Sequence, residues 1–150
     1  QSNKVRKAVA AVSRIQSIDS ADLGARVGRV AVEMGRVMPV LIQVDLAGEA
    51  TKSGVPEAAL PAVLESLRGV SGLSVDGLMA IPRFLEDPEN VRPYFKRLRE
   101  LRDQAVARGL LAGGQLSMGM SHDFEAAIEE GATIVRVGTA IFGERPAKSA

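Results

Sequence analysis

Two short segments near the end of the chain combine small residues with hydroxyl groups. They are residues 116–121 (LSMGMS) and residues 134–139 (IVRVGT), and one amphipathic helix is expected between them. Small residues let a ligand approach the backbone, and Ser and Thr hydroxyls add hydrogen-bond donors. Two apolar strands that end in this way, side by side, predict a site for an anion, most often phosphate.

The candidate binding residues in these segments are Ser117, Ser121, Gly138 and Thr139. Each also has a structural explanation. Ser121 or Asp123 could cap the helix that follows the first segment, and Gly138 with Thr139 could form a plain turn. Either segment alone is a weak signal. Together, after consecutive strands, they make a phosphate site as good an explanation as a structural one.

Arg136 lies inside the last expected strand. Alternation along residues 134–137 puts Val135 and Val137 on one face of that strand and Arg136 on the other. A charged side chain on an inner face is costly unless it is paired. Two explanations are open: a structural ion pair with Asp45 or Asp76, or a fixed donor to an atom of a ligand.

The composition excludes several kinds of site. The 150 residues contain 19 Lys plus Arg and 18 Asp plus Glu, and this balance gives no case for a nucleic-acid or membrane partner. The absence of cysteine excludes disulfides and cysteine-ligated metals, and the single His122 excludes a histidine-rich metal site. We expect no metal and assign His122 no ligand role.

Helices and strands are expected to alternate along the chain. Apolar, β-branched runs predict strands at residues 15–18, 39–46, 74–81, 115–118 and 134–137. Apolar periodicity and capping residues predict helices at residues 4–12, 21–34, 56–67, 93–108 and 123–130. Pro61 offers an alternative start for the third helix.

Strands that alternate with helices predict an α/β fold with a parallel sheet and right-handed crossovers. Five strands suit either a doubly wound sheet or part of a (β/α)8 TIM barrel. The barrel is favoured because its phosphate site frequently follows strands seven and eight. The chain also opens without Met or a lead-in. We therefore expect residues 1–150 to be one partial barrel domain, a C-terminal fragment with about strands four to eight and its N-terminal strands missing.

Four stretches resemble one known family. Residues 116–145 (LSMGMSHDFEAAIEEGATIVRVGTAIFGER) are similar to the C-terminal signature of the pyridoxal-phosphate homeostasis proteins. Residues 1–4 (QSNK), 40–55 (VLIQVDLAGEATKSGV) and 75–82 (VDGLMAIP) resemble other segments of that family. The resemblance implies a barrel of the alanine racemase N-terminal type that binds pyridoxal 5′-phosphate (PLP). It also implies a role in vitamin B6 homeostasis, with no established catalytic turnover.

The resemblance also implies roles for individual residues. Arg136 corresponds to an arginine that faces the pyridine nitrogen of PLP. Ser117, Gly138 and Thr139 correspond to residues that hold the phosphate, and Ser121 belongs to the same motif. The family's Schiff-base lysine would lie upstream of Gln1, so no lysine of this chain corresponds to it.

The resemblance implies a cytoplasmic protein, not an enzyme, whose partner is PLP and whose expected recipients are PLP-dependent apoenzymes. An alternative is a PLP-dependent enzyme of the alanine racemase type, which needs a tyrosine acid/base, and Tyr94 lies at a helix start instead. A sugar-phosphate enzyme would need mouth carboxylates that only Asp45 and Glu49 could supply. Lys52 is expected at the same mouth, as a solvated lysine or as a partner for an aldehyde.

Overall fold

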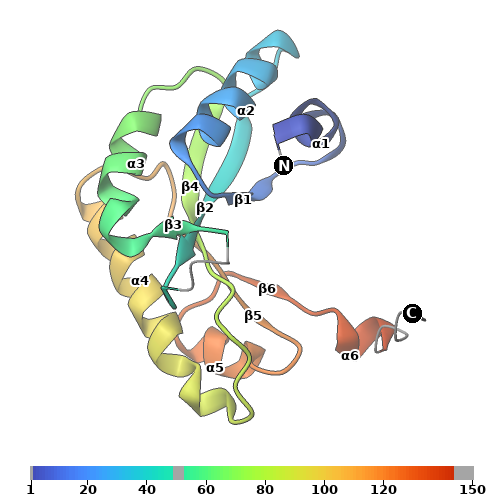
Figure 1. Ribbon diagram of the computed structural model, residues 1–150, viewed down its shortest axis with the longest axis vertical. Coiled ribbons are helices and arrows are strands. Elements are labelled where there is room, and N and C mark those ends of the chain that lie inside the picture. The colour runs from blue at the N-terminus through green and yellow to red at the C-terminus, as the bar shows by residue number, and fades with distance from the viewer. Residues whose placement is uncertain (1, 49–52, 144–150) are drawn as a thin grey trace.

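The computed structural model describes residues 2–48 and 53–143, which form a parallel sheet with helices packed on one face (Figure 1). The five longer strands are β1 (Ile15–Ile18), β2 (Met38–Asp45), β4 (Leu73–Met79), β5 (Gln115–Met120) and β6 (Ile134–Arg136). The short β3 (Val55–Pro56) pairs only with β2. The main order is β1-β2-β4-β5-β6, and every pair is parallel.

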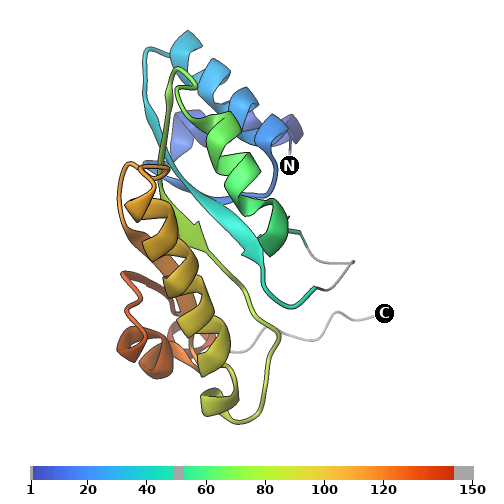
Figure 2. The same cartoon turned by 90° about the vertical axis from the view of Figure 1, so that its left-hand side faces the viewer.

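Within residues 2–48 and 53–143, six α-helices alternate with these strands. They are α1 (Val5–Ala11), α2 (Ala21–Glu33), α3 (Leu60–Leu67), α4 (Arg92–Ala107), α5 (Phe124–Glu129) and α6 (Thr139–Phe142). Figure 2 shows α2, α3 and α4 following one another over the same face of the sheet. In the described ranges, no helix is long and apolar enough to cross a membrane.

The spatial order of the strands follows their order in the chain. A doubly wound sheet would reverse its order at a switch point, whereas successive strands of a barrel stay neighbours. The expectation of an α/β fold with parallel strands and a partial barrel is therefore confirmed. All five expected strands and all five expected helices are present.

Three details differ from the sequence-based expectation. The third helix begins at Leu60, after a 3-10 turn, so that Pro61 lies in its first turn, where its missing N–H is not needed. Strand β4 ends at Met79 instead of residue 81, and β5 continues to Met120. The short α6 was not expected at all.

The hydrophobic core lies between the sheet and the helices. The expected apolar stripe of α4 is confirmed, because Phe95, Leu98, Leu101 and Ala105 are all buried. Complete burial of a side chain such as Phe95 contributes roughly 1.5–3 kcal/mol. The packing of α4 holds β4 and β5, and these two strands carry much of the candidate site described below.

A close approach of backbones joins β4 to β5. Gly77 of β4 pairs with Gln115 of β5. A Cβ on Gly77 would lie 2.0 Å from the carbonyl oxygen of Gln115, which no real structure tolerates. The two strands could accept a side chain here only by moving apart.

We expect Gly77→Ala to lower the free energy of unfolding by about 3 kcal/mol, because overpacking against backbone cannot be relieved by a rotamer change. Urea denaturation would measure this loss. Gly114→Ala is the control, since its Cβ would meet nothing closer than an Arg102 side-chain nitrogen at 3.6 Å. Equal losses in the two variants would contradict the steric argument.

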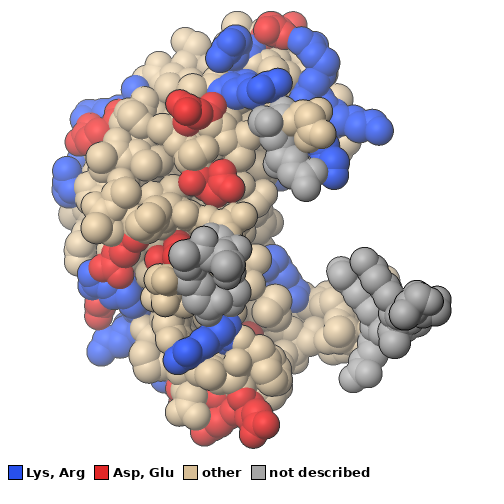
Figure 3. Space-filling model, in the orientation of Figure 1, with Lys and Arg blue, Asp and Glu red and all other residues tan. Residues whose placement is uncertain are grey.

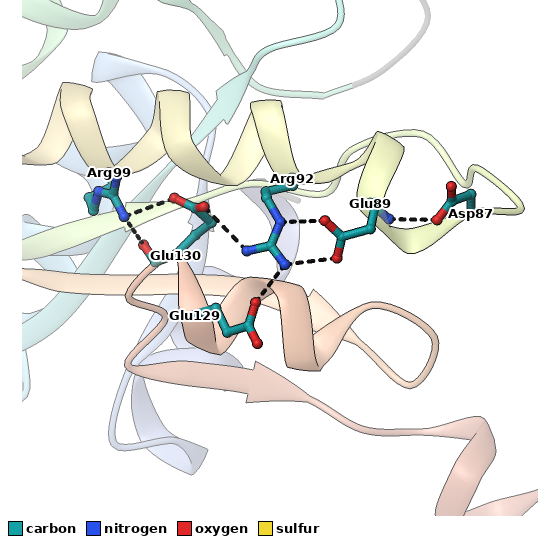
Figure 4. A network of polar contacts seen from close by, with 6 residues as sticks. All are labelled: Asp87, Glu89, Arg92, Arg99, Glu129 and Glu130. Atoms are coloured by element: carbon teal, nitrogen blue, oxygen red, sulfur yellow. Dashed lines mark hydrogen bonds and ion pairs between the residues drawn. The ribbon is translucent and has the colours of Figure 1, made fainter.

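A network of ion pairs ties the start of α4 to the end of α5 (Figure 4). Arg92 contacts Glu89 at 2.6 Å, Glu129 at 2.5 Å and Glu130 at 3.4 Å, and Arg99 contacts Glu130 at 2.8 Å. Hydrogen bonds to these carboxylates, with that of Glu89 the strongest, raise the pKa of Arg92. The hydrogen bond from Arg92 in turn lowers the pKa of Glu89 below its ordinary value of 4.5.

The lowered pKa of Glu89 gives its contribution to stability a pH dependence. Because the folded-state pKa is below 4.5, this contribution is present above pH 4.5 and is lost as the pH falls through the lowered value. We expect Glu89→Gln to melt at a lower temperature than the natural protein at about pH 7, and the difference to shrink as the pH falls below 4.5. Glu86→Gln is the control, because the described residues give its side chain no ion pair. A Glu89→Gln difference that stays constant with pH would contradict this assignment.

Candidate functional site

Arg136, at the end of β6, contacts its neighbouring strand β5 and the residue that follows β4, one strand further along the sheet. Its Nη1 donates to Oγ of Ser117 at 2.6 Å, and its Nη2 donates to the carbonyl oxygen of Ala80 at 2.9 Å. Ser117 lies on β5, and Ala80 directly follows β4. The guanidinium therefore reaches from the carboxyl end of β6, past Ser117 inside β5, to the carboxyl end of β4. Ligands bind at the carboxyl ends of the strands in parallel α/β sheets.

The hydrogen-bond partners of the Arg136 guanidinium are neutral groups. Burial lowers the pKa of this guanidinium, and the attraction of the Asp123 carboxylate opposes that shift. Both hydrogen-bond acceptors, the Ser117 hydroxyl and the Ala80 carbonyl, are uncharged. A partly desolvated cation with neutral partners favours the approach of an electron-rich ligand atom.

The structural ion pair with Asp45 or Asp76 is wrong for the described residues. Asp76 instead contacts Arg14 at 3.3 Å and accepts from the Ser74 hydroxyl at 2.6 Å. Asp45 accepts from the backbone amides of residues 47 and 48, at 3.0 and 3.1 Å. Both carboxylates therefore have partners other than Arg136.

Ser117 is completely buried, with an exposed fraction of 0 %. Its hydroxyl accepts from Arg136 and donates to Oε1 of Gln16 at 2.6 Å. Gln16 lies on β1, and β2 and β4 separate that strand from β5, so this hydrogen bond crosses the sheet instead of following it. Gln16 could not be recognised from the sequence, because nothing in the local pattern of residues 15–18 distinguishes it from a solvent-facing strand residue.

Ser121 connects the two segments of small and hydroxyl residues, 116–121 and 134–139. Its Oγ accepts from the backbone amides of Gly138 at 3.1 Å and Ala140 at 3.3 Å, so it caps α6. The alternative cap of α5 is not formed. Asp123 occupies that N-cap position, yet its carboxylate accepts from the Met120 amide at 2.6 Å.

Gly138 has no steric reason to be glycine within the described chain. Its φ is −116°, and a Cβ there would meet no heavy atom within 4 Å. Gly119 differs, because its φ is +90° and a Cβ would lie 2.6 Å from Cβ of Ala127. Gly119 therefore allows α5 to pack on β5, whereas Gly138 borders open space beside the exposed Thr139.

The space beside Gly138 and Thr139 is open to solvent. Figure 3 shows the molecule hollowed between the part that carries α1 and the projecting α6. His122 is exposed, as expected, and its Nε2 lies 2.9 Å from the carbonyl oxygen of Glu86. The described residues contain no cluster of His, Asp and Glu that could hold a metal ion. Lys52 and Glu49 lie outside the described residues.

We expect Ser121→Ala to speed amide hydrogen exchange at Gly138 and Ala140. Each amide loses its acceptor, and one hydrogen bond contributes about 1 kcal/mol, so exchange should be roughly fivefold faster at both positions. Ser117→Ala is the control, since Ser117 contacts neither amide. Unchanged exchange in Ser121→Ala would contradict the proposed cap of α6.

Comparison with known proteins identifies the family to which the chain belongs. A family model described as the N-terminal domain of alanine racemase matches residues 1–146. The pyridoxal phosphate homeostasis proteins of Aquifex aeolicus and Vibrio cholerae are 49% and 40% identical over 145 residues. Each alignment covers 97% of this chain but only 64% and 61% of those proteins, so the chain spans less than two thirds of their length.

Solved structures show the same relationship. The structure of PipY from Synechococcus elongatus without PLP is 38% identical, with a TM-score of 0.88, over 95% of this chain and 67% of that one. The PLP-bound PipY structure is 37% identical, with a TM-score of 0.87, over 95% and 66%. Alanine racemase from Clostridium difficile shares the fold, with a TM-score of 0.70, at 14% identity over 99% of this chain and 40% of that one. The resemblance seen in the sequence is thus confirmed, and the chain belongs to the alanine racemase N-terminal domain family.

Proposed function

We propose that this chain is part of a cytoplasmic protein that binds PLP and serves its homeostasis, by buffering the cofactor or delivering it to apoenzymes. The observation that carries the proposal is Arg136, a partly desolvated guanidinium whose two hydrogen-bond acceptors among the described residues, on Ser117 and Ala80, are both neutral. The names of the relatives and the PLP-bound PipY structure support the same cofactor.

The donors around Arg136 fit the pyridine nitrogen of PLP. A guanidinium has five N–H groups and no acceptor, and it is not deprotonated near neutral pH. Arg136 can therefore donate to the lone pair of the nitrogen but cannot protonate it. PLP supplies an electrophilic aldehyde and an electron-withdrawing ring, and the ring withdraws electrons less strongly while its nitrogen is unprotonated. The arrangement suits retention of the cofactor more than broad carbanion chemistry.

The phosphate is assigned to Ser121, Gly138 and Thr139. Oγ of Ser121 accepts from two backbone amides, and the described residues offer no acceptor for its proton, which leaves that proton for a phosphate oxygen. The open space at Gly138 would let the phosphate reach the backbone. Ser117, expected on the phosphate, gives its proton to Gln16 instead, so we assign it to Arg136 and the ring end of the site.

We further propose that the five longer strands are strands four to eight of a (β/α)8 barrel, in one domain with strands that these residues do not include. The order of the strands and the coverage of the relatives support this assignment. The lysine that would react with the aldehyde of PLP then lies on one of the strands that these residues do not include. An enzyme of the alanine racemase type has less support, because Tyr94 packs against the hydrophobic core instead of reaching the candidate site.

The full-length protein should take up PLP and show its visible absorbance, and borohydride should fix the cofactor to one lysine. We expect Arg136→Ala to weaken PLP binding about 10- to 100-fold or to shift the absorbance, because it removes a charged hydrogen-bond donor. Gly138→Val should also weaken binding by filling the space beside the phosphate.

His122→Ala is the control for both variants, since its ring contacts Phe84 and Glu86 and none of the assigned residues. Equilibrium dialysis and absorption spectra would measure the effects. A colourless full-length protein that binds no PLP would contradict the proposed function. Normal binding and an unchanged spectrum in Arg136→Ala would instead make Arg136 structural.

A further inference from the structure

We infer that Gln16 is a positioning residue that acts through Ser117 to fix the direction in which Arg136 donates to its ligand. Three hydrogen bonds form one chain: Ser117 donates to Oε1 of Gln16 at 2.6 Å, Arg136 donates to Ser117 at 2.6 Å, and Arg136 donates to the Ala80 carbonyl at 2.9 Å. The inference rests on the proposed function, because it concerns the hydrogen bond that Arg136 would donate to the pyridine nitrogen of PLP.

The direction of each hydrogen bond in this chain follows from the chemistry of its members. A guanidinium can only donate, so the Ser117 hydroxyl must be the acceptor for Arg136. Ser117 then has a single proton left to place, and the side chain is completely buried. Gln16 supplies the acceptor for that proton. A buried hydroxyl proton without an acceptor would cost about 1–3 kcal/mol, so this third partner decides whether the arrangement is stable.

Gln16 therefore affects Arg136 although, within the described part of the chain, no hydrogen bond joins the two side chains directly. Without the Gln16 acceptor, the Ser117 hydroxyl would rotate to find another acceptor, and its lone pairs would turn away from Nη1. Arg136 would keep the Ala80 carbonyl alone, and a planar group held by one acceptor can swing about it. Held by two acceptors on two strands, the guanidinium has one orientation, and its remaining N–H groups have fixed directions.

The position of Gln16 also links distant parts of the sheet. β1 and β6 are the two ends of the described strand order, yet the hydrogen-bond chain connects them across β5. A purely structural reading is that Gln16 only ties β1 to β5. That reading predicts a loss of stability when Gln16 is replaced, with no change in the environment of a bound cofactor, and the two readings are thus separable.

The test uses the full-length protein loaded with PLP. Gln16→Met keeps the length of the side chain and removes the acceptor. We expect the absorbance maximum of bound PLP to shift and the dissociation constant to rise about three- to tenfold, the effect of misdirecting one hydrogen bond. Gln104→Met, on the exposed side of α4, is the matched control and should change neither quantity.

A double-mutant cycle tests whether the effect passes through Ser117. Ser117→Ala should shift the absorbance as Gln16→Met does, and the double variant should shift it no further than either single variant. If Gln16→Met does not fold, Gln16→Asn replaces it, because the shorter side chain withdraws the acceptor. Additive effects in the double variant would overturn the inference.

The outcomes separate this inference from the proposed function. A full-length protein that binds no PLP contradicts the proposed function and the inference together. A protein that binds PLP normally, with a Gln16→Met spectrum and dissociation constant equal to those of the natural protein, overturns the inference alone. A Gln16→Met variant that loses only stability also overturns it, since Gln16 would then be a structural tie.

Discussion

The candidate site depends on one charged, partly desolvated guanidinium that lies between the ends of β4 and β6 and Ser117 of β5. Such a cation is unfavourable unless acceptors surround it, and here both acceptors are neutral. One of them, the Ala80 carbonyl, can serve because β4 ends at Met79 and its ladder does not extend past Ala80. The other, Ser117, can serve because a third strand accepts its proton. Arg136 thus has both acceptors because β4 ends at Met79 and because Ser117 can donate its own proton to Gln16 on β1.

Features far from Arg136 keep these strand ends in place. Gly77 lets β4 and β5 approach closely, and Gly119 lets α5 lie against β5. The ion pairs of Arg92 with Glu129 and Glu130 then hold α5 to α4 (Figure 4). Because α5 connects the loop after β5 to β6, these contacts influence where Ser121 and Arg136 meet. Sterics and surface charge therefore contribute to the site without touching any ligand.

Much of the fold could be predicted from the sequence, because it depends on local periodicity. The apolar runs predicted all five longer strands. Alternation along residues 134–137 predicted that Arg136 lies on the face opposite Val135. The partners of polar groups could not be predicted in this way. Gln16 and Ser117 are 101 residues apart and meet only because of how the sheet curves. An ion pair of Arg136 with Asp45 or Asp76 was one of two open explanations, but Asp45 contacts backbone amides and Asp76 contacts Arg14 instead.

The role of a glycine likewise cannot be predicted from the residues next to it in the sequence. Gly119 and Gly138 look alike in the sequence, since each follows an apolar strand residue. Their meaning is set by φ and by neighbouring atoms, which no local pattern encodes. Gly119 is explained completely by the packing of α5, so it provides no argument for a ligand. Gly138 is not explained by the described chain, and for that reason it is the glycine that supports a bound phosphate. A residue that the fold does not require is stronger evidence of function than one that it does.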